Sequence, residues 1–368
     1  MTTQPLRGRI LTPEGWIDGA LSYDHHIRAI ERTATADADT IILPGFIDLH
    51  VHGGGGADTM QGGNAVETLA RLHARHGTTS LLATTMTAPT TGITDALAAL
   101  APCCRQRPAG AARVLGVHLE GPYINSGKLG AQPNNTCVAL MEQFEAFNAI
   151  APILLVTLAP EIPGHFDIIE KLSARGVKVQ LGHTLGSYED GVEALKRGAA
   201  GFTHLFNAMT AMHHREPGMV GAALAHAEYA ELIPDLLHIH PGAIRAALRS
   251  IPHLYCVTDS TAAAGMPDGQ YRLGSHVVTK CLGGVRLADG TLAGSTLTMD
   301  QALRNLVSIG LDLADASRRL SQNAADYLGL ADRGRLAPGC FADFVVLDAA
   351  LNLKQVFVEG ESIDLADA

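Results

Sequence analysis

Residues 46–52 read Phe46-Ile47-Asp48-Leu49-His50-Val51-His52. The run is mostly apolar and short, which predicts a buried strand. Successive side chains of a strand point to opposite faces, so His50 and His52 share one face. Two neutral imidazoles held side by side form a chelate for a borderline divalent metal such as zinc.

The residues after this strand place the two imidazoles at its C-terminal end. A His-x-His pair taken at random is more often a pair of core histidines, because histidine is often buried without being a ligand. Here the four glycines Gly53 to Gly56 follow directly, so the chain leaves the strand at once. This context favours the metal-binding interpretation.

The whole chain has the composition of a globular enzyme. It has 368 residues, 47% of them hydrophobic and 17% charged, which excludes a disordered protein and predicts one large domain with a small one. The formal net charge is −10 and Lys and Arg form no run, so we expect no nucleic-acid partner. An anionic substrate stays open, because a single Arg can bind phosphate locally.

The cysteines and the N-terminus indicate the compartment. Six cysteines are scattered without a Cys-x-x-Cys pair, which is typical of free thiols in a reducing environment. Residues 1–9 are polar without an apolar signal core, and no apolar run reaches membrane-spanning length. We therefore expect a soluble cytoplasmic protein with no membrane partner.

The middle of the chain, about residues 45–335, alternates strand and helix patterns. The candidate strands are 46–50, 80–84, 114–119, 153–158, 177–181, 201–203, 232–237 and 254–258. Amphipathic segments lie between most of them, for example 66–76, 166–175, 188–197 and 243–248. Eight β-then-α units predict an α/β fold, a (β/α)8 TIM-like barrel, with a doubly wound sheet as the alternative. A Gly-rich insertion at 269–294 predicts a hairpin.

The two chain ends have a different pattern. Short apolar runs alternate with turn signals from residue 7 to 42, and the same style returns at 342–347 and 355–360. This pattern is typical of antiparallel strands. We therefore expect a small β-sandwich domain built from residues 1–44 and 336–368, with the metal-dependent hydrolase barrel, residues 45–335, inserted between them.

Lone ionisable residues stand at the C-terminal ends of four further strands. They are Glu120, His183, His204 and Asp259. Each alone has an ordinary explanation, such as a helix cap, a turn or a satisfied interior histidine. In a barrel, however, these strand ends meet on one face, so residues far apart in the sequence come together.

Together these residues predict a catalytic metal centre. Three His or Glu ligands with an open position are the pattern of a catalytic zinc site, and His50 and His52 make room for a second ion bridged by Glu120. A carboxylate beside the cation, Asp259, suits a shuttle that takes a proton from the attacking water and passes it to a leaving amine.

Arg215 follows in a loop beyond the third of these strands. Its planar fork suits a phosphate or carboxylate, and a solvated loop arginine is an equally good explanation on chemistry alone. The neighbouring His213-His214 pair is ambiguous, and we assign it no role in metal binding.

Motifs along nearly the whole chain resemble those of a known family. The paired histidines, His183, His204, Asp259 and the tail at 334–343 resemble the amidohydrolase superfamily. More closely, the chain resembles the N-acetylglucosamine-6-phosphate deacetylase family. The motifs that carry this resemblance are Glu120-Gly121-Pro122-Tyr123, Gly182-His183-Thr184, His204-Leu205-Phe206-Asn207-Ala208-Met209, Arg215-Glu216-Pro217-Gly218, Val257-Thr258-Asp259 and Leu292-Ala293-Gly294-Ser295.

The resemblance implies hydrolysis of the acetamide of N-acetyl-D-glucosamine 6-phosphate to glucosamine 6-phosphate and acetate, in amino-sugar catabolism. It implies a divalent metal, Zn²⁺ with Fe²⁺ as the alternative, one or two ions per subunit, and a homodimer or homotetramer. It places the proton shuttle on Asp259. It places the metal ligands on Glu120, His183, His204, His50 and His52.

The resemblance also implies the substrate contacts. They fall on Ala131, Gln132, Asn207, Ala208, Arg215, His238, Leu292, Ala293 and Gly294. The counterpart of Arg215 serves the phosphate, across a dimer interface. Some family members have a His in place of Gln132, lack the paired histidines and bind one metal. Because glutamine donates a hydrogen bond but carries no charge, we expect a second metal to polarise the carbonyl here.

Three alternatives stay open. Other amidohydrolases, such as cyclic-amide hydrolases and nucleobase deaminases, share the barrel and the paired histidines, but cyclic-amide hydrolases bridge their metals with a Lys that residues 157–161 lack. The same chemistry on N-acetylgalactosamine 6-phosphate is the second alternative. A non-catalytic scaffold that keeps only the fold is the third, and the intact candidate ligands argue against it.

Overall fold

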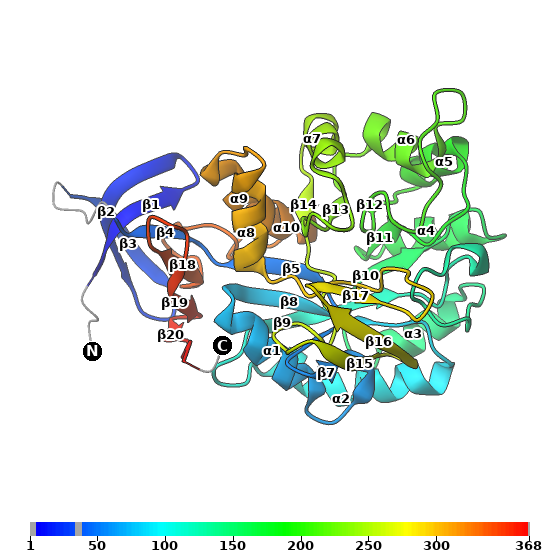
Figure 1. Cartoon of the computed structure of the whole chain (residues 1–368), viewed down its shortest axis with the longest axis horizontal. Coiled ribbons are helices and arrows are strands. Elements are labelled where there is room, and N and C mark those ends of the chain that lie inside the picture. The colour runs from blue at the N-terminus through cyan, green and yellow to red at the C-terminus, as the bar shows by residue number, and fades with distance from the viewer. Residues whose placement is uncertain (1–4, 34–38, 367–368) are drawn as a thin grey trace.

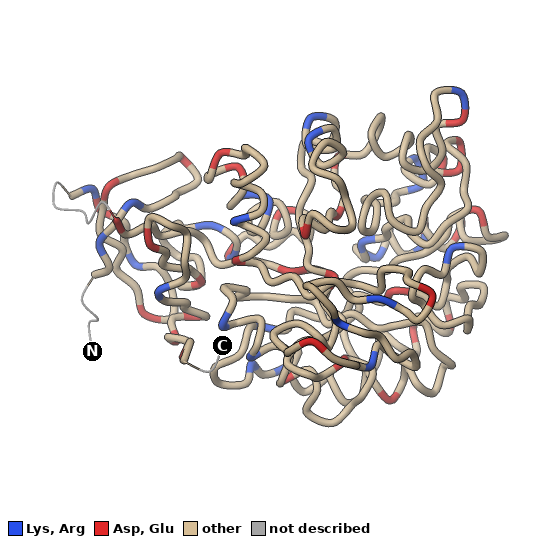
Figure 2. Tube along the Cα trace, viewed as in Figure 1, with Lys and Arg blue, Asp and Glu red and all other residues tan. Residues whose placement is uncertain are grey.

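The computed structural model describes residues 5–33 and 39–366 of the chain. The two chain ends form a small β domain at one side of a larger body of strands and helices (Figure 1). Acidic and basic residues are interspersed over both parts (Figure 2). Within the described ranges, every helix is too short or too polar to cross a bilayer.

The small domain is a seven-stranded sheet in which both chain ends meet. Its order is β20-β19-β18-β4-β1-β2-β3, and β18 pairs antiparallel with β4. Buried apolar side chains such as Ile10, Leu21 and Phe344 give the sheet a core of its own. The sheet fits the predicted β-sandwich, and the domain boundaries stay a prediction. Its strands are β1 (Leu6–Thr12), β2 (Gly15–Tyr23), β3 (Ile27–Arg32), β4 (Ile41–Pro44), β18 (Phe344–Leu347), β19 (Leu353–Val358) and β20 (Glu361–Ser362).

Eight strands form the barrel. Six of them make a parallel sheet in sequence order, and the last two pair with one another. The backbone N–H of Leu205 donates to the backbone carbonyl of Glu231, and the backbone N–H of Asp259 donates to the backbone carbonyl of His50. These bonds join the two groups of strands on both sides. The ring therefore closes, as predicted. Its strands are β5 (Phe46–Val51), β8 (Thr78–Thr85), β9 (Arg113–Glu120), β10 (Ile153–Leu158), β11 (Lys178–Leu181), β12 (Gly201–Phe202), β13 (Glu231–Leu232) and β14 (Tyr255–Cys256).

A helix follows each barrel strand and covers its outer face, as α1 does with Leu69 and Ala70 buried. These helices are α1 (Ala65–Arg75), α2 (Thr90–Arg105), α3 (Met141–Asn148), α4 (His165–Ser173), α5 (Tyr188–Lys196), α6 (Gly218–His226), α7 (Pro241–Ser250) and α8 (Met299–Ser308). Two further helices, α9 (Leu313–Leu320) and α10 (Gln322–Leu328), lie between α8 and β18 in the sequence. Shorter elements are β6 (Gly53–Gly54), β7 (Ala57–Asp58), η1 (Thr59–Gln61) and η2 (Ser126–Lys128).

The predicted strand at 232–237 is wrong in extent, because β13 ends at Leu232. Pro234 has no N–H to donate to a ladder. The Asp235 side chain accepts hydrogen bonds from the backbone of Leu237 and His238, and Leu236 has a φ of 64°. This local turn competes with the strand and brings His238 to the barrel mouth.

The insertion at 269–294 contains the predicted hairpin, formed by its first two strands, and a third antiparallel strand extends it. The strands are β15 (Gly269–Leu273), β16 (His276–Cys281) and β17 (Gly284–Arg286). The buried side chains of Leu273, Val278 and Val285 pack with Met86 and Ala293. The insertion therefore has its own apolar core and lies against residues at the barrel mouth.

Candidate active site

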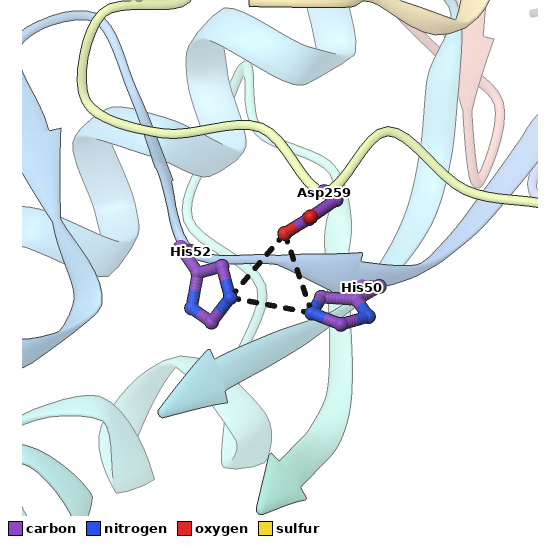
Figure 3. Close-up of side chains that lie close together, drawn as sticks. All are labelled: His50, His52 and Asp259. Atoms are coloured by element: carbon purple, nitrogen blue, oxygen red, sulfur yellow. Dashed lines mark hydrogen bonds and ion pairs between the residues drawn. The ribbon is translucent and has the colours of Figure 1, made fainter. Parts of the chain in front are cut away.

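The paired histidines of β5 lie as strand alternation predicts. His50 and His52 are both buried, and their Nε2 atoms are 3.2 Å apart. Asp259 Oδ1 lies 3.4 Å from each of these nitrogens (Figure 3). A Cβ on Gly53 would lie 2.4 Å from the Ala57 carbonyl oxygen, so only glycine lets the chain turn this closely after the strand.

Glu120, the last residue of β9, lies between two pairs of imidazoles. Its Oε1 is 3.0 Å from His183 Nε2 and 3.1 Å from His204 Nε2. Its Oε2 is 3.0 Å from His52 Nε2 and 3.5 Å from His50 Nε2. One carboxylate oxygen thus faces each pair, which is the geometry of a bridging ligand.

Three of these side chains come from strained backbone. His183, His204 and Asp259 have φ values of 48°, 28° and 50°, in the left-handed region that favours glycine. Each residue comes shortly after a barrel strand, where the chain turns away from the sheet. Such conformations cost roughly 1–3 kcal/mol each and cluster at functional sites.

The donor set suits a divalent cation. The groups Glu120-His183-His204 and His50-His52-Asp259 each bring three ligand atoms within 4.8 Å of one another. Imidazole and carboxylate are the ligands that zinc prefers. Burial works against ionisation of Glu120, but the neighbouring imidazoles outweigh it and hold the pKa of Glu120 well below its usual value. The carboxylate is therefore available as a ligand.

His50 is surrounded by negative charge. Burial alone would lower its pKa, but the carboxylates of Glu120, Asp259 and Glu231 outweigh it and raise the pKa well above its usual value. The site therefore favours a positive charge at this point, which a metal ion also supplies.

Two buried carboxylates of the site were not among the predicted residues. Asp48 Oδ2 accepts a 2.6 Å hydrogen bond from the Thr258 hydroxyl and so ties β5 to the segment after β14, and burial raises the pKa of Asp48 to about 7. Glu231 Oε2 lies 3.0 Å from His50 Nδ1. Asp48 stands two residues before His50, on the same strand face, and that spacing could have pointed to it. Glu231 directly precedes a predicted strand and gave no comparable signal.

A cavity of about 230 Å³ opens above this centre. Its floor includes His52, Glu120, His183, His204 and Asp259, whereas His50 and Ala293 are fully buried and do not line it. The volume is small for a ligand pocket and suits a metabolite of sugar size. The predicted substrate contacts that line it are Ala131, Gln132, Asn207, Ala208, His238, Leu292 and Gly294.

A family model described as the amidohydrolase family matches residues 41–363, which include all of the barrel and these ligand candidates. The chain belongs to the amidohydrolase family. A protein of Escherichia coli O157:H7 named N-acetylgalactosamine-6-phosphate deacetylase is 39% identical over 380 residues, covering 98% of this chain and 99% of the relative. The N-acetylglucosamine-6-phosphate deacetylase of Bacillus subtilis strain 168 is 39% identical over 326 residues, covering 85% and 82%.

A solved structure supports the same placement of this amidohydrolase. A mutant N-acetyl-D-glucosamine-6-phosphate deacetylase from Mycobacterium smegmatis, in complex with N-acetyl-D-glucosamine-6-phosphate, superposes with a TM-score of 0.91 at 33% identity, covering 99% of this chain and 100% of that one. These relatives confirm the resemblance to the N-acetylglucosamine-6-phosphate deacetylase family.

Within one amidohydrolase chain, Arg215 does not lie at the cavity. It lines a separate hollow together with Leu185 and Tyr188, and its Nη1 lies 2.8 Å from His214 Nε2.

His238 is built to carry a positive charge. Its Nδ1 lies 2.6 Å from Asp235 Oδ2. Burial lowers the pKa of His238, but the hydrogen bond and the charge of Asp235 outweigh it, and the pKa is raised. Because the residue also lines the cavity, an imidazolium at this rim can bind an anion.

Proposed function

We propose that this amidohydrolase removes the acetyl group of N-acetyl-D-glucosamine 6-phosphate, giving glucosamine 6-phosphate and acetate in amino-sugar catabolism. The observation that carries the proposal is the position of Glu120 between two imidazole pairs, below a cavity of sugar size and beside Asp259. The ligand named for the Mycobacterium smegmatis structure supports the substrate.

We propose that divalent ions bind at two groups. Glu120, His183 and His204 would hold one ion, and His50 and His52 would hold the second beside Asp259, with Glu120 within reach of both groups. The nitrogen and oxygen donors favour Zn²⁺, with Fe²⁺ as the alternative. When bound, such an ion acidifies a water molecule and polarises the acetamide carbonyl.

The remaining work falls on the side chains. Asp259 takes a proton from the attacking water and returns it to the amine nitrogen as the C–N bond breaks. The Nε2 of Gln132 donates a hydrogen bond to Glu120. Its second hydrogen can donate to the acyl oxygen of the substrate. His238 and Arg215 of the partner subunit bind the phosphate, so remote binding energy positions the amide.

A homodimer follows from the same assignment, because Arg215 lies away from the cavity of its own chain. Leu185 and Met212, near Arg215, are 49% and 60% exposed, which fits a surface covered by a second copy. The six cysteines are all free, which fits a reducing cytoplasm.

N-acetylgalactosamine 6-phosphate is the second candidate substrate. The Escherichia coli relative that carries this name matches almost the whole chain. The two substrates differ only in the configuration at one ring carbon, and both carry the acetamide and the phosphate on which the assignment depends.

An acetate-release assay on both 6-phosphorylated N-acetylhexosamines tests the proposal. We expect turnover of N-acetylglucosamine 6-phosphate with the higher kcat/KM, loss of turnover after chelation, and recovery on adding Zn²⁺. Unphosphorylated N-acetylglucosamine is the control and should react poorly. If the Zn²⁺-loaded protein released acetate from neither phosphorylated sugar, the proposal would be refuted.

A further inference from the structure

Glu231 is a carboxylate buried beneath the candidate metal centre. It begins β13 and is fully shielded from solvent. Its Oε2 lies 3.0 Å from His50 Nδ1 and 3.3 Å from the backbone N of His204, and its Oε1 accepts from the Tyr255 hydroxyl at 3.3 Å. Among the described residues, its hydrogen-bond partners include no Lys or Arg.

This contact fixes the direction of the His50 ring. With Nδ1 donating to Glu231, the lone pair of Nε2 points toward His52 and Asp259, where a cation would be bound. The neighbouring imidazoles are held differently. His183 Nδ1 donates to the Lys128 carbonyl oxygen over 2.8 Å, and the Nδ1 atoms of His52 and His204 have no hydrogen-bond partner in the described structure.

A carboxylate on the far nitrogen of a ligating imidazole fixes its tautomer and raises its basicity as a ligand. His50 is thus the one histidine of the four that the described structure orients in this way. The same carboxylate also accepts a hydrogen bond from the backbone N of His204, which belongs to the other group of ligands, so Glu231 contacts both groups.

We propose that Glu231 is a positioning residue, which acts through His50 to set the affinity of the His50-His52-Asp259 group for a divalent cation. The proposal deepens the metal-dependent function argued above and rests on it. Removal of the negative charge weakens this second group selectively, because Glu231 contacts the group Glu120-His183-His204 only through the backbone N of His204 and not through a ligand side chain.

Tyr255 supplies a matched control. Its hydroxyl contacts the other oxygen of Glu231 and accepts from Gln180 Nε2 over 2.5 Å. Tyr255→Phe therefore disturbs the same buried network while leaving the contact between Glu231 and His50 in place. Glu231→Gln keeps the side-chain volume and one acceptor oxygen for His50, and replaces the charged carboxylate with a neutral amide.

The test is a titration of the chelator-treated full chain with Zn²⁺ alone. Calorimetry measures the Kd of each ion, and elemental analysis measures the number of ions bound per chain. We expect two Zn²⁺ per wild-type chain, and a Kd for the second ion raised about 10–100-fold by Glu231→Gln, with the first ion within about threefold. Tyr255→Phe should bind both ions as the wild type does. Thermal unfolding of each metal-free variant measures any general loss of stability.

Three results would overturn the proposal. The first is Glu231→Gln binding both ions with wild-type affinity, and the second is Glu231→Gln binding both ions more weakly to the same degree. The third is a wild-type chain that binds a single Zn²⁺. Acetate release is measured separately, so a wild type that binds two ions without releasing acetate would refute the proposed substrate and leave the role of Glu231 standing.

Discussion

Gln132 donates a hydrogen bond from Nε2 to Oε2 of Glu120 over 2.5 Å. Its Oε1 accepts from the backbone N of Thr87 at 2.7 Å, so the amide is held at both ends and only 5% of the residue is exposed. One amide hydrogen engages the carboxylate, and the second remains for an acyl oxygen. Gln132 thus orients the Glu120 carboxylate as well as lining the cavity.

Gln132→Leu should lower kcat about 100-fold, because it removes both the support of Glu120 and a donor for the oxyanion. Steady-state kinetics on N-acetylglucosamine 6-phosphate measures the loss, and elemental analysis should show metal retained at His183 and His204. A variant with unchanged kcat would show that the amide takes no part in the reaction.

Asp259→Asn should lower kcat about 10²–10⁴-fold, because an amide cannot carry the proton from water to the amine. Asp259 is not part of the group Glu120-His183-His204, so the ion at that group should be retained on elemental analysis. Asp95→Asn, on the exposed face of α2, is the control and should react normally. Substantial turnover by Asp259→Asn would remove the proton shuttle from the mechanism.

Arg215→Ala should raise KM about 10–100-fold with kcat little changed, because it deletes a charge-assisted contact to the phosphate. The rate on unphosphorylated N-acetylglucosamine should not change. Arg249→Ala, on the exposed face of α7, is the matched control. Sedimentation of the wild type should show a dimer, and a monomer with full activity would contradict the proposed contact across subunits.

Glu359 should make the fold sensitive to acid. It accepts hydrogen bonds from Arg113 at the start of β9 and from Arg333, at 2.8 Å and 2.6 Å, and so joins the barrel to the small domain. Burial raises the pKa of Glu359, but these guanidinium groups outweigh it and lower the pKa to about 2. The folded carboxylate therefore binds its proton at lower pH than the unfolded one, whose pKa is about 4.3.

The stabilisation by Glu359 is complete above pH ~5 and is lost as the pH falls toward 2. Glu359→Gln should lower the free energy of unfolding by about 3 kcal/mol at pH 7, and this difference from the wild type should shrink at pH 3. Urea unfolding at both pH values measures it. Glu361→Gln, in a half-exposed pair with Arg107, should cost less than about 1 kcal/mol. If the difference in unfolding free energy between Glu359→Gln and the wild type did not change with pH, the lowered pKa of Glu359 would be contradicted.

The sequence predicted the fold and most of the candidate site, because both follow from local rules. Period-two alternation places His50 and His52 on one face, and parallel barrel strands bring Glu120, His183 and Asp259 to one rim. The extent of β13 was wrong, because Pro234 and the turn at Asp235 override the apolar pattern. The roles of these residues stay predictions.

By itself, the sequence determined which residues reach the mouth of the barrel, since strand order and alternation are properties of the chain pattern. Only the tertiary structure decided which of these side chains contact one another and which of them line the cavity. The two oxygens of Glu120 face different imidazole pairs, Glu231 holds His50 from below, and Arg215 lies outside its own cavity. These relationships depend on distances between strands far apart in sequence, which packing fixes and no local pattern encodes.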